Sequence, residues 1–148
     1  MEKNTKTLAL DMDGTFVNFY GVGGWLDYLE AYDTTPYAIA KPLFSMSLLA
    51  RYLNRARANG HRIVIISWLS KSGTTEYNER VAEVKRKWLA KHLPSVQFDE
   101  IHIVPYGTPK SKVTIADILF DDEERNRAEW GEGAYAPEKI FEILKKIS

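Results

Sequence analysis

The segment 62–67 constrains the fold more than any other part of the sequence. It reads RIVIIS and holds four consecutive branched apolar residues. A continuous apolar run without polar alternation is typical of a strand that is buried on both faces of a parallel sheet. Shorter strand-like runs occur at 7–10, 100–104 and 118–120, and longer stretches separate them. This alternation predicts an α/β, three-layer, Rossmann-like fold with a mainly parallel central sheet and helices on both faces.

The longer stretches carry apolar residues at helical spacing. We expect helices over 44–59 and 76–92, and two more over 123–130 and 137–147, with a short edge strand at 134–136. These elements cover most of the chain after the first strand and leave one long stretch without a period.

Length and composition fit one globular domain. The chain has 148 residues and no Cys, and its 20 Lys and Arg balance its 20 Asp and Glu. We expect a single domain over 1–148, without disulfides, thiolate zinc sites or Cys nucleophiles. A net charge of zero argues against an extended nucleic-acid surface, and no apolar stretch approaches the roughly 18 residues of a membrane span. With no export signal recognised, the expected location is the cytoplasm, and the oligomeric state is left open.

The segment 16–43 breaks the alternation of strands and helices. Its aromatic content is about twice the 12% of the whole chain. A loop of this length in a compact domain is usually functional or disordered, and this one is too aromatic for disorder. We expect an excursion beyond the sheet. Two interpretations stay open, a mini-core that packs its own rings and a stacking surface for a base or another flat group.

Polar residues follow the predicted strands at the point where each one ends. Asp11 and Asp13 come after the first strand, and Ser67 ends the second. Asp121 and Asp122 follow the strand that precedes them. Because ligands of an open parallel sheet bind beyond the carboxyl ends of its strands, we expect four carboxylates and one hydroxyl to converge on one rim.

This set of groups suits phosphoryl chemistry. Carboxylates held close together repel one another unless a cation neutralises them or one is protonated, and Mg²⁺ accepts an all-oxygen site with few protein ligands. Lys110 or Lys112 would bring an ammonium group to the same rim. One carboxylate could attack phosphorus to give an aspartyl phosphate. A second, two residues on, could protonate the leaving oxygen and later activate water.

Four motifs in this order resemble the haloacid dehalogenase superfamily of hydrolases. They are DMDGT after the first strand, a Ser after IVII, a Lys, and ILFDD. The resemblance implies a haloacid-dehalogenase-like fold in which Asp11 is the nucleophile and an Mg²⁺ ligand. Asp13 would be the general acid and base and would reach the metal through its carbonyl group. Gly14 and Thr15 would shape the turn, and Thr15 is counted among the phosphate-binding residues.

The later motifs take the remaining roles that the resemblance implies. Ser67 would hydrogen-bond the phosphoryl group. Asp121 would bind Mg²⁺ directly, and Asp122 would bind it through water or orient its ligands. Lys110 is the preferred phosphate-binding lysine and Lys112 the alternative. The segment 16–43 would be a small cap or flap that selects the substrate.

The expected function is that of an Mg²⁺-dependent phosphomonoester hydrolase acting through an aspartyl phosphate on a small phosphorylated metabolite. A nucleoside monophosphate is one candidate, because of the aromatic segment and because KVTIADILFDD is similar to deoxyribonucleotidase members. The alternatives are a phosphate-sensing or partner-binding module with little turnover and a polynucleotide end phosphatase. Asp13 favours turnover, since receiver-like domains lack a base at that position.

Three other features receive ordinary structural interpretations. The basic residues 85–87, together with Lys91, are expected to form a solvated helix face. The three His residues share no spacing and fit no metal pattern. Trp68 lies either in the core or at the floor of the site. A calcium loop is disfavoured because Thr15 and Phe16 stand where such a loop needs Asp or Asn and then Gly.

Overall fold

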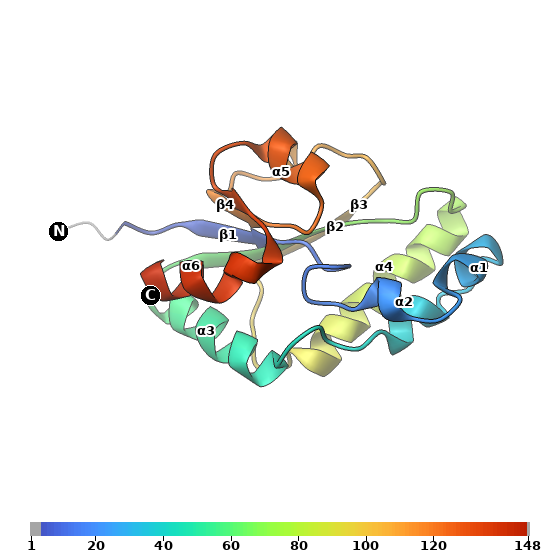
Figure 1. Cartoon of the computed structure of the whole chain (residues 1–148), viewed down its shortest axis with the longest axis horizontal. Coiled ribbons are helices and arrows are strands. Elements are labelled where there is room, and N and C mark those ends of the chain that lie inside the picture. Colours follow the sequence, from blue (N-terminus) through green and yellow to red (C-terminus); the bar gives the residue numbers. More distant parts are fainter. Residues whose placement is uncertain (1–3, 148) are drawn as a thin grey trace.

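The computed structural model describes residues 4–147, in which five strands form one sheet in the order β3-β2-β1-β4-β5 (Figure 1). The strands are β1 (Thr7–Leu10), β2 (Arg62–Trp68), β3 (Glu100–Val104), β4 (Ile118–Phe120) and β5 (Ala134–Tyr135). All four pairings between them are parallel. The predicted three-layer α/β, Rossmann-like fold with a parallel sheet is confirmed.

Helices cover both faces of this sheet. The helices of the described residues are α1 (Trp25–Glu30), α2 (Thr35–Ile39), α3 (Met46–Ala58), α4 (Thr75–His92), α5 (Glu124–Trp130) and α6 (Ile140–Ile147), with 3₁₀ turns η1 (Phe19–Gly21), η2 (Lys110–Lys112) and η3 (Pro137–Lys139). Figure 1 shows α5 above the sheet and α3, α4 and α6 below it. Within residues 4–147, no helix combines the length and the apolar character needed to cross a membrane.

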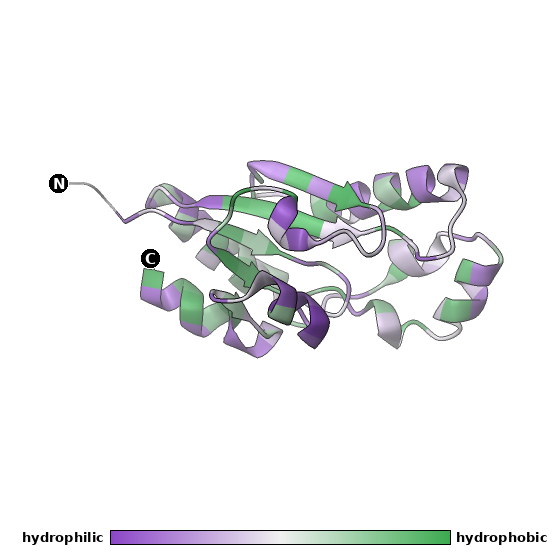
Figure 2. Ribbon diagram, turned by 90° about the horizontal axis from the view of Figure 1, so that it is seen from above, coloured by the Kyte–Doolittle hydropathy of each residue, from purple (hydrophilic) through white to green (hydrophobic). Residues whose placement is uncertain are grey.

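The two faces of the sheet bury different amounts of apolar surface. Leu8 and Leu10 of β1 point into the larger cluster, which α3, α4 and α6 complete, whereas Ala9 belongs to a small cluster on the opposite face. Val113 and Trp130 pack against that small cluster. The middle parts of the central strands are accordingly hydrophobic (Figure 2). On the face that α5 covers, the loop that carries η2 also packs against the sheet, through Val113.

Local capping explains where the two long helices begin. The Ser45 hydroxyl accepts a hydrogen bond from the Leu48 amide at the start of α3, and the Thr74 hydroxyl accepts one from the Tyr77 amide at the start of α4. Gly60 follows α3 with φ +95°, a conformation that favours glycine. The predicted bounds of these helices are met to within two residues.

The prediction of a solvated basic face on α4 is wrong for Lys85. Arg86 and Lys87 are exposed, but Lys85 is buried. It lies four residues after Val81 and eight after Tyr77, which places it on the buried side of the helix. A lysine is ordinarily expected to be exposed to solvent, whereas the helical spacing of Lys85 places its side chain in the interior.

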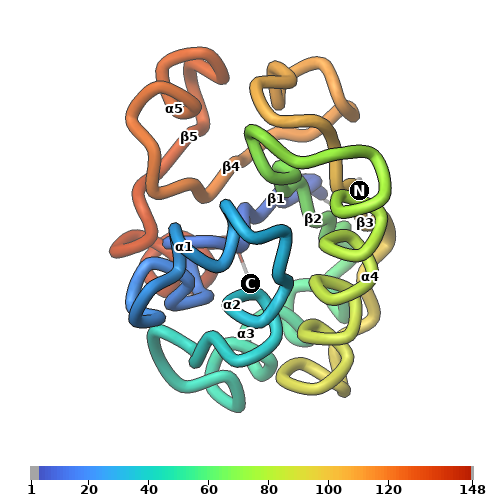
Figure 3. The backbone as a smooth tube through the Cα atoms, turned by 90° about the vertical axis from the view of Figure 1, so that its right-hand side faces the viewer, coloured from blue at the N-terminus to red at the C-terminus, as the bar shows by residue number. Residues whose placement is uncertain are grey.

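The segment between β1 and α3 lies beyond the carboxyl end of the sheet (Figures 1 and 3). It contains η1, α1 and α2, and hydrogen bonds from several side chains of α4 attach it to that helix. The Tyr77 hydroxyl donates to the Asp33 carbonyl at 2.9 Å, and the Trp88 indole donates to the Ala40 carbonyl at 2.7 Å. The segment predicted as a flap is thus held against the helix whose residues face the strand ends.

Candidate active site

Three aspartates meet where β1 and β4 end side by side. Leu10 of β1 pairs in register with Phe120 of β4, and the Asp11 amide donates to the Phe120 carbonyl at 2.9 Å. Asp11 and Asp121 therefore leave neighbouring strands at the same level. With Asp122 they form a cluster in which one oxygen from each carboxylate lies within 4.8 Å of the others.

A buried lysine lies against this cluster. The Lys110 ammonium donates to Asp11 Oδ1 at 2.8 Å and to Asp121 Oδ2 at 2.7 Å. Burial would lower the pKa of Lys110, but the charges of Asp11 and Asp121 outweigh it and raise the pKa above its ordinary value. Lys112, the alternative in the sequence, is exposed. Of the two lysines that the sequence offered, Lys110 is therefore the one that lies against the aspartate cluster.

Thr15 locks the loop that carries the first aspartates. Its hydroxyl donates to Asp11 Oδ2 at 2.9 Å and accepts a hydrogen bond from the Asp122 amide at 3.1 Å. Its own amide donates to the Met12 carbonyl at 3.1 Å. Both groups serve the loop, as expected for a residue that shapes the turn, while direct phosphate contact by Thr15 stays a prediction.

Two features of position 14 require glycine: its backbone conformation and the closeness of the Asp122 side chain. Its φ is +83°, and a Cβ atom at this position would overlap the Asp122 carboxylate. The loop can therefore approach Asp122 closely only because position 14 has no side chain.

The start of α5 holds Asp121 in place. Asp121 Oδ1 accepts a hydrogen bond from the Glu123 amide at 2.9 Å, and Oδ2 accepts one from the Asn126 side chain at 3.1 Å. Arg127 donates to the Asp121 carbonyl at 2.9 Å. Asn126 was missed by the sequence reasoning, although its place one helical turn after the DDE run was a usable signal.

The electrostatics of the cluster call for a further cation. Burial, together with the nearby Asp11 charge, raises the pKa of Asp122 to about 8. The same two causes raise the pKa of Asp121, although Lys110 opposes them. When all three carboxylates are ionised beside one ammonium, about two negative charges remain for a cation to neutralise, and all the candidate ligand atoms are oxygens. Asp11, Asp121 and Asp122 therefore fit a divalent, oxygen-preferring ion such as Mg²⁺.

Asp13 and Ser67 form a second group with Lys85, beside the cluster. The Lys85 ammonium donates to Asp13 Oδ2 at 2.9 Å, to Ser67 Oγ at 2.8 Å and to the Trp68 carbonyl at 2.7 Å. Burial raises the pKa of Asp13, and the Lys85 charge opposes that rise. The Asp13 side chain thus faces Lys85, and metal contact through the Asp13 carbonyl stays a prediction.

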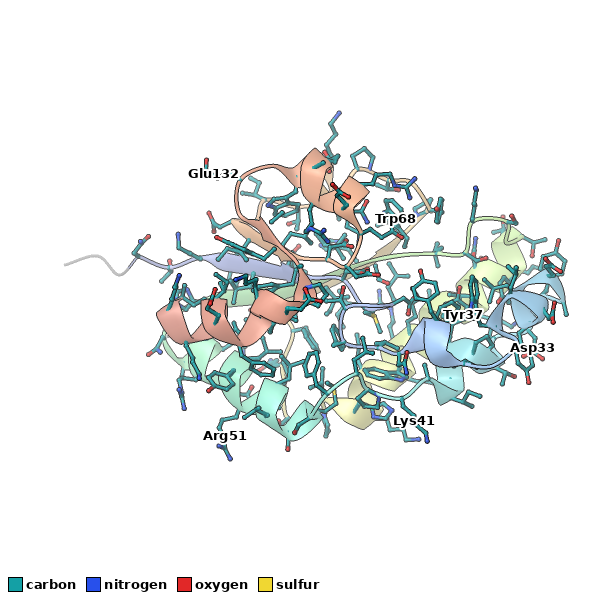
Figure 4. All side chains as sticks on the ribbon, in the orientation of Figure 1. Asp33, Tyr37, Lys41, Arg51, Trp68 and Glu132 are labelled. Carbon is teal, nitrogen blue, oxygen red and sulfur yellow. The ribbon has the colours of Figure 1, made fainter. Side chains whose placement is uncertain are left out.

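Both groups open into one pocket of about 510 Å³. Its polar floor includes Asp11, Asp13, Ser67 and Lys110. Its walls are largely aromatic, with rings contributed by Phe19, Tyr20, Trp25, Tyr32, Tyr37, Trp68 and Tyr106. Figure 4 shows Trp68 on the α5 side and Tyr37 on the α2 side of the strand ends. Trp68 is therefore a wall of the site.

The aromatic segment packs some of its rings against one another, as the mini-core interpretation predicts, and lines the pocket with others, while stacking of a flat ligand on them stays a prediction. Phe19 and Tyr37 are buried and stack with their ring centroids 4.6 Å apart, which is a small core of its own. Tyr20 and Tyr32 are about half exposed and line the pocket. Opposite them, the Arg125 guanidinium lies 5.0 Å from the centre of the Trp68 ring.

The fold and the site define a parallel α/β protein with a cluster of three aspartates, whose oxygens fit a cation, at the carboxyl edge of its sheet. Among solved structures, D,D-heptose 1,7-bisphosphate phosphatase from Burkholderia thailandensis is similar to it, with a TM-score of 0.54 and 13% sequence identity. The match covers 95% of this chain and 99% of that chain. No protein-family model and no curated protein sequence matches. At this identity the likeness is one of fold.

Proposed function

We propose that this protein is an Mg²⁺-dependent phosphomonoester hydrolase of the haloacid dehalogenase superfamily. The observation that carries the proposal is the position of Asp11. It opens into the pocket, has Lys110 on one carboxylate oxygen and Thr15 on the other, and shares a cation-compatible cluster with Asp121 and Asp122. The four motifs and the fold shared with a phosphatase support the same assignment.

Asp11, Asp121 and Asp122 would hold the metal. Bound Mg²⁺ supplies positive charge that offsets the charge of a phosphoryl group and of the carboxylates around it. Lys110 and the Ser67 hydroxyl would bind the phosphoryl oxygens, which their positions in the lining of the pocket support.

Asp11 and Asp13 divide the chemistry between them. The Asp11 carboxylate attacks phosphorus, the ester P–O bond breaks, and Asp13 gives a proton to the departing alcohol oxygen. Asp13 then takes a proton from water, whose oxygen attacks phosphorus and releases phosphate from Asp11. The raised pKa of Asp13 suits a group that is protonated for the first step.

The pocket walls support a flat leaving group. Tyr20, Tyr32, Trp68 and Tyr106 present partly exposed rings to the space above the acidic floor, and aromatic rings stack on nucleobases. We infer that the substrate is a small phosphorylated metabolite, with a nucleoside monophosphate as the first candidate. The balanced net charge offers no broad footprint for a polynucleotide.

Hydrolysis assays test the proposal. Wild-type protein should release p-nitrophenol from p-nitrophenyl phosphate in Mg²⁺ and lose this activity in EDTA. Asp11→Asn should reduce it to background, whereas Asp27→Asn, an exposed position, should leave it unchanged. Activity that neither EDTA nor Asp11→Asn affects would contradict the mechanism. Among nucleoside and sugar monophosphates, kcat/KM should favour the nucleotides, and the absence of that preference would overturn the substrate class.

A further inference from the structure

Lys85 is a buried charge whose position packing alone does not explain. Its side chain is 2% exposed, although it comes from the middle of an otherwise amphipathic helix. Burying an ammonium group is costly unless it is fully paired. The three hydrogen bonds that it donates use all three of its donors. Its partners are the Asp13 and Ser67 side chains of the proposed site and the backbone carbonyl of Trp68, whose ring lines the pocket.

We propose that Lys85 is a positioning residue that fixes the hydrogen-bonding directions of Ser67 and Asp13. This role rests on the proposed phosphatase function and adds to it a residue outside the four motifs. Lys85 touches neither Asp11 nor the metal-compatible cluster in any contact described above. It acts through the two side chains that it holds.

The direction of the Ser67 hydroxyl follows from the chemistry of an ammonium group. An ammonium can only donate, so Ser67 Oγ must accept the hydrogen bond of 2.8 Å from Lys85. The hydroxyl hydrogen of Ser67 then points away from Lys85. Since Ser67 lines the pocket, this hydrogen is free to be donated to a phosphoryl oxygen.

The ammonium group of Lys85 also distinguishes the two carboxylate oxygens of Asp13. Oδ2 accepts the hydrogen bond of 2.9 Å from Lys85, which leaves Oδ1 as the oxygen that carries the proton to the leaving group. Lys85 also lies 5.3 Å from the centre of the Tyr37 ring, on α2 of the flap. The ammonium therefore ties the Asp13 loop, the end of β2 and the flap to one helix.

The test compares two aryl phosphates of similar size. The leaving group of p-nitrophenyl phosphate departs without a proton, whereas that of phenyl phosphate is much more basic and needs one. Lys85→Met should lower kcat/KM for phenyl phosphate about tenfold more than for p-nitrophenyl phosphate, since a misdirected Asp13 protonates poorly. Asp13→Asn should show the same discrimination. Lys87→Met, an exposed lysine on the same helix, should change neither value.

Several outcomes would overturn this role. Equal losses on both substrates would mean that Lys85 only supports the fold, and no loss would mean that it has no role. If Lys85→Met does not fold, Lys85→Arg keeps the charge with a different reach and should show the same discrimination at smaller size. A wild-type protein without Asp11-dependent hydrolysis would overturn the proposed function itself. Retained Asp11-dependent activity with equal losses would overturn only the role of Lys85.

Discussion

At the scale of single residues, the site is organised by two buried lysines that reach it from different elements. Lys110 neutralises Asp11 and Asp121, and Lys85 pairs with Asp13. Neither lysine donates a hydrogen bond to Asp122 among the contacts described above, and Asp122 is the acid whose pKa rises to about 8. The acid that the lysines do not reach is therefore the one most dependent on an added cation.

Asp122 makes the stability of the metal-free protein depend on pH. Because burial and Asp11 raise its folded-state pKa from 3.8 to about 8, its stabilising contribution is full below about pH 4 and is lost as the pH rises through 8. In EDTA the melting temperature should fall between about pH 5 and about pH 8 and level off above that range, with a smaller fall in Asp122→Asn. Mg²⁺ should restore it at the higher pH in the wild type. Equal pH slopes for both proteins would contradict this assignment.

At the scale of elements, a strand or helix could be predicted from the sequence when its apolar residues formed a clear run or a regular spacing. The strand 100–104 and the strand 118–120 were predicted with their observed bounds, because their apolar runs are short and clearly limited. By contrast, α1 and α2 have six and five residues, too few for a helical period to emerge. α2 packs against α4, which lies far away in the sequence, and α1 packs against α2 and η1.

Lys85 shows that residue type alone is a poor guide to which side of a helix is exposed. Its neighbours Arg86 and Lys87 are solvated, so residue type predicted a common face for the three. The helical period was the better guide, since Lys85 continues the row of Tyr77 and Val81. The four motifs led to Asp11, Asp121 and Asp122 directly, whereas Lys85 and Asn126 depend on the tertiary fold to reach the site.

The flap should loosen when its attachment to α4 is removed. Trp88→Phe deletes the indole donor of the 2.7 Å hydrogen bond to the buried Ala40 carbonyl, at a cost of about 1–3 kcal/mol. Hydrogen exchange should accelerate at the amides of Asn18 and Leu43, which join the two ends of the flap. The amide of Ile65 in the central strand should stay protected. Uniform acceleration across the chain, or none, would contradict this attachment.

At the scale of the whole molecule, the balanced charge conceals an uneven distribution. No Lys or Arg occurs between Thr7 and Ala40, where Asp11 and Asp13 lie. The parallel sheet corrects this, because all its strands end at one edge and bring Lys110 from far along the chain to Asp11. The fold thus brings a lysine to the first aspartates of a chain that has no basic patch in its first part, as the proposed binding of one phosphoryl group requires.

The central claim is that Asp11 carries the phosphoryl group during turnover. The most direct measurement is mass spectrometry of peptides from protein that is quenched in acid while it hydrolyses p-nitrophenyl phosphate in Mg²⁺. Asp13→Asn should accumulate a hydroxylamine-labile phosphoryl group on the peptide that contains Asp11, because the first step needs little proton transfer with this substrate while the second lacks its base. The group should be absent from Asp11→Asn. Sustained turnover with no phosphoryl group at Asp11, or with one on another residue, would contradict the account.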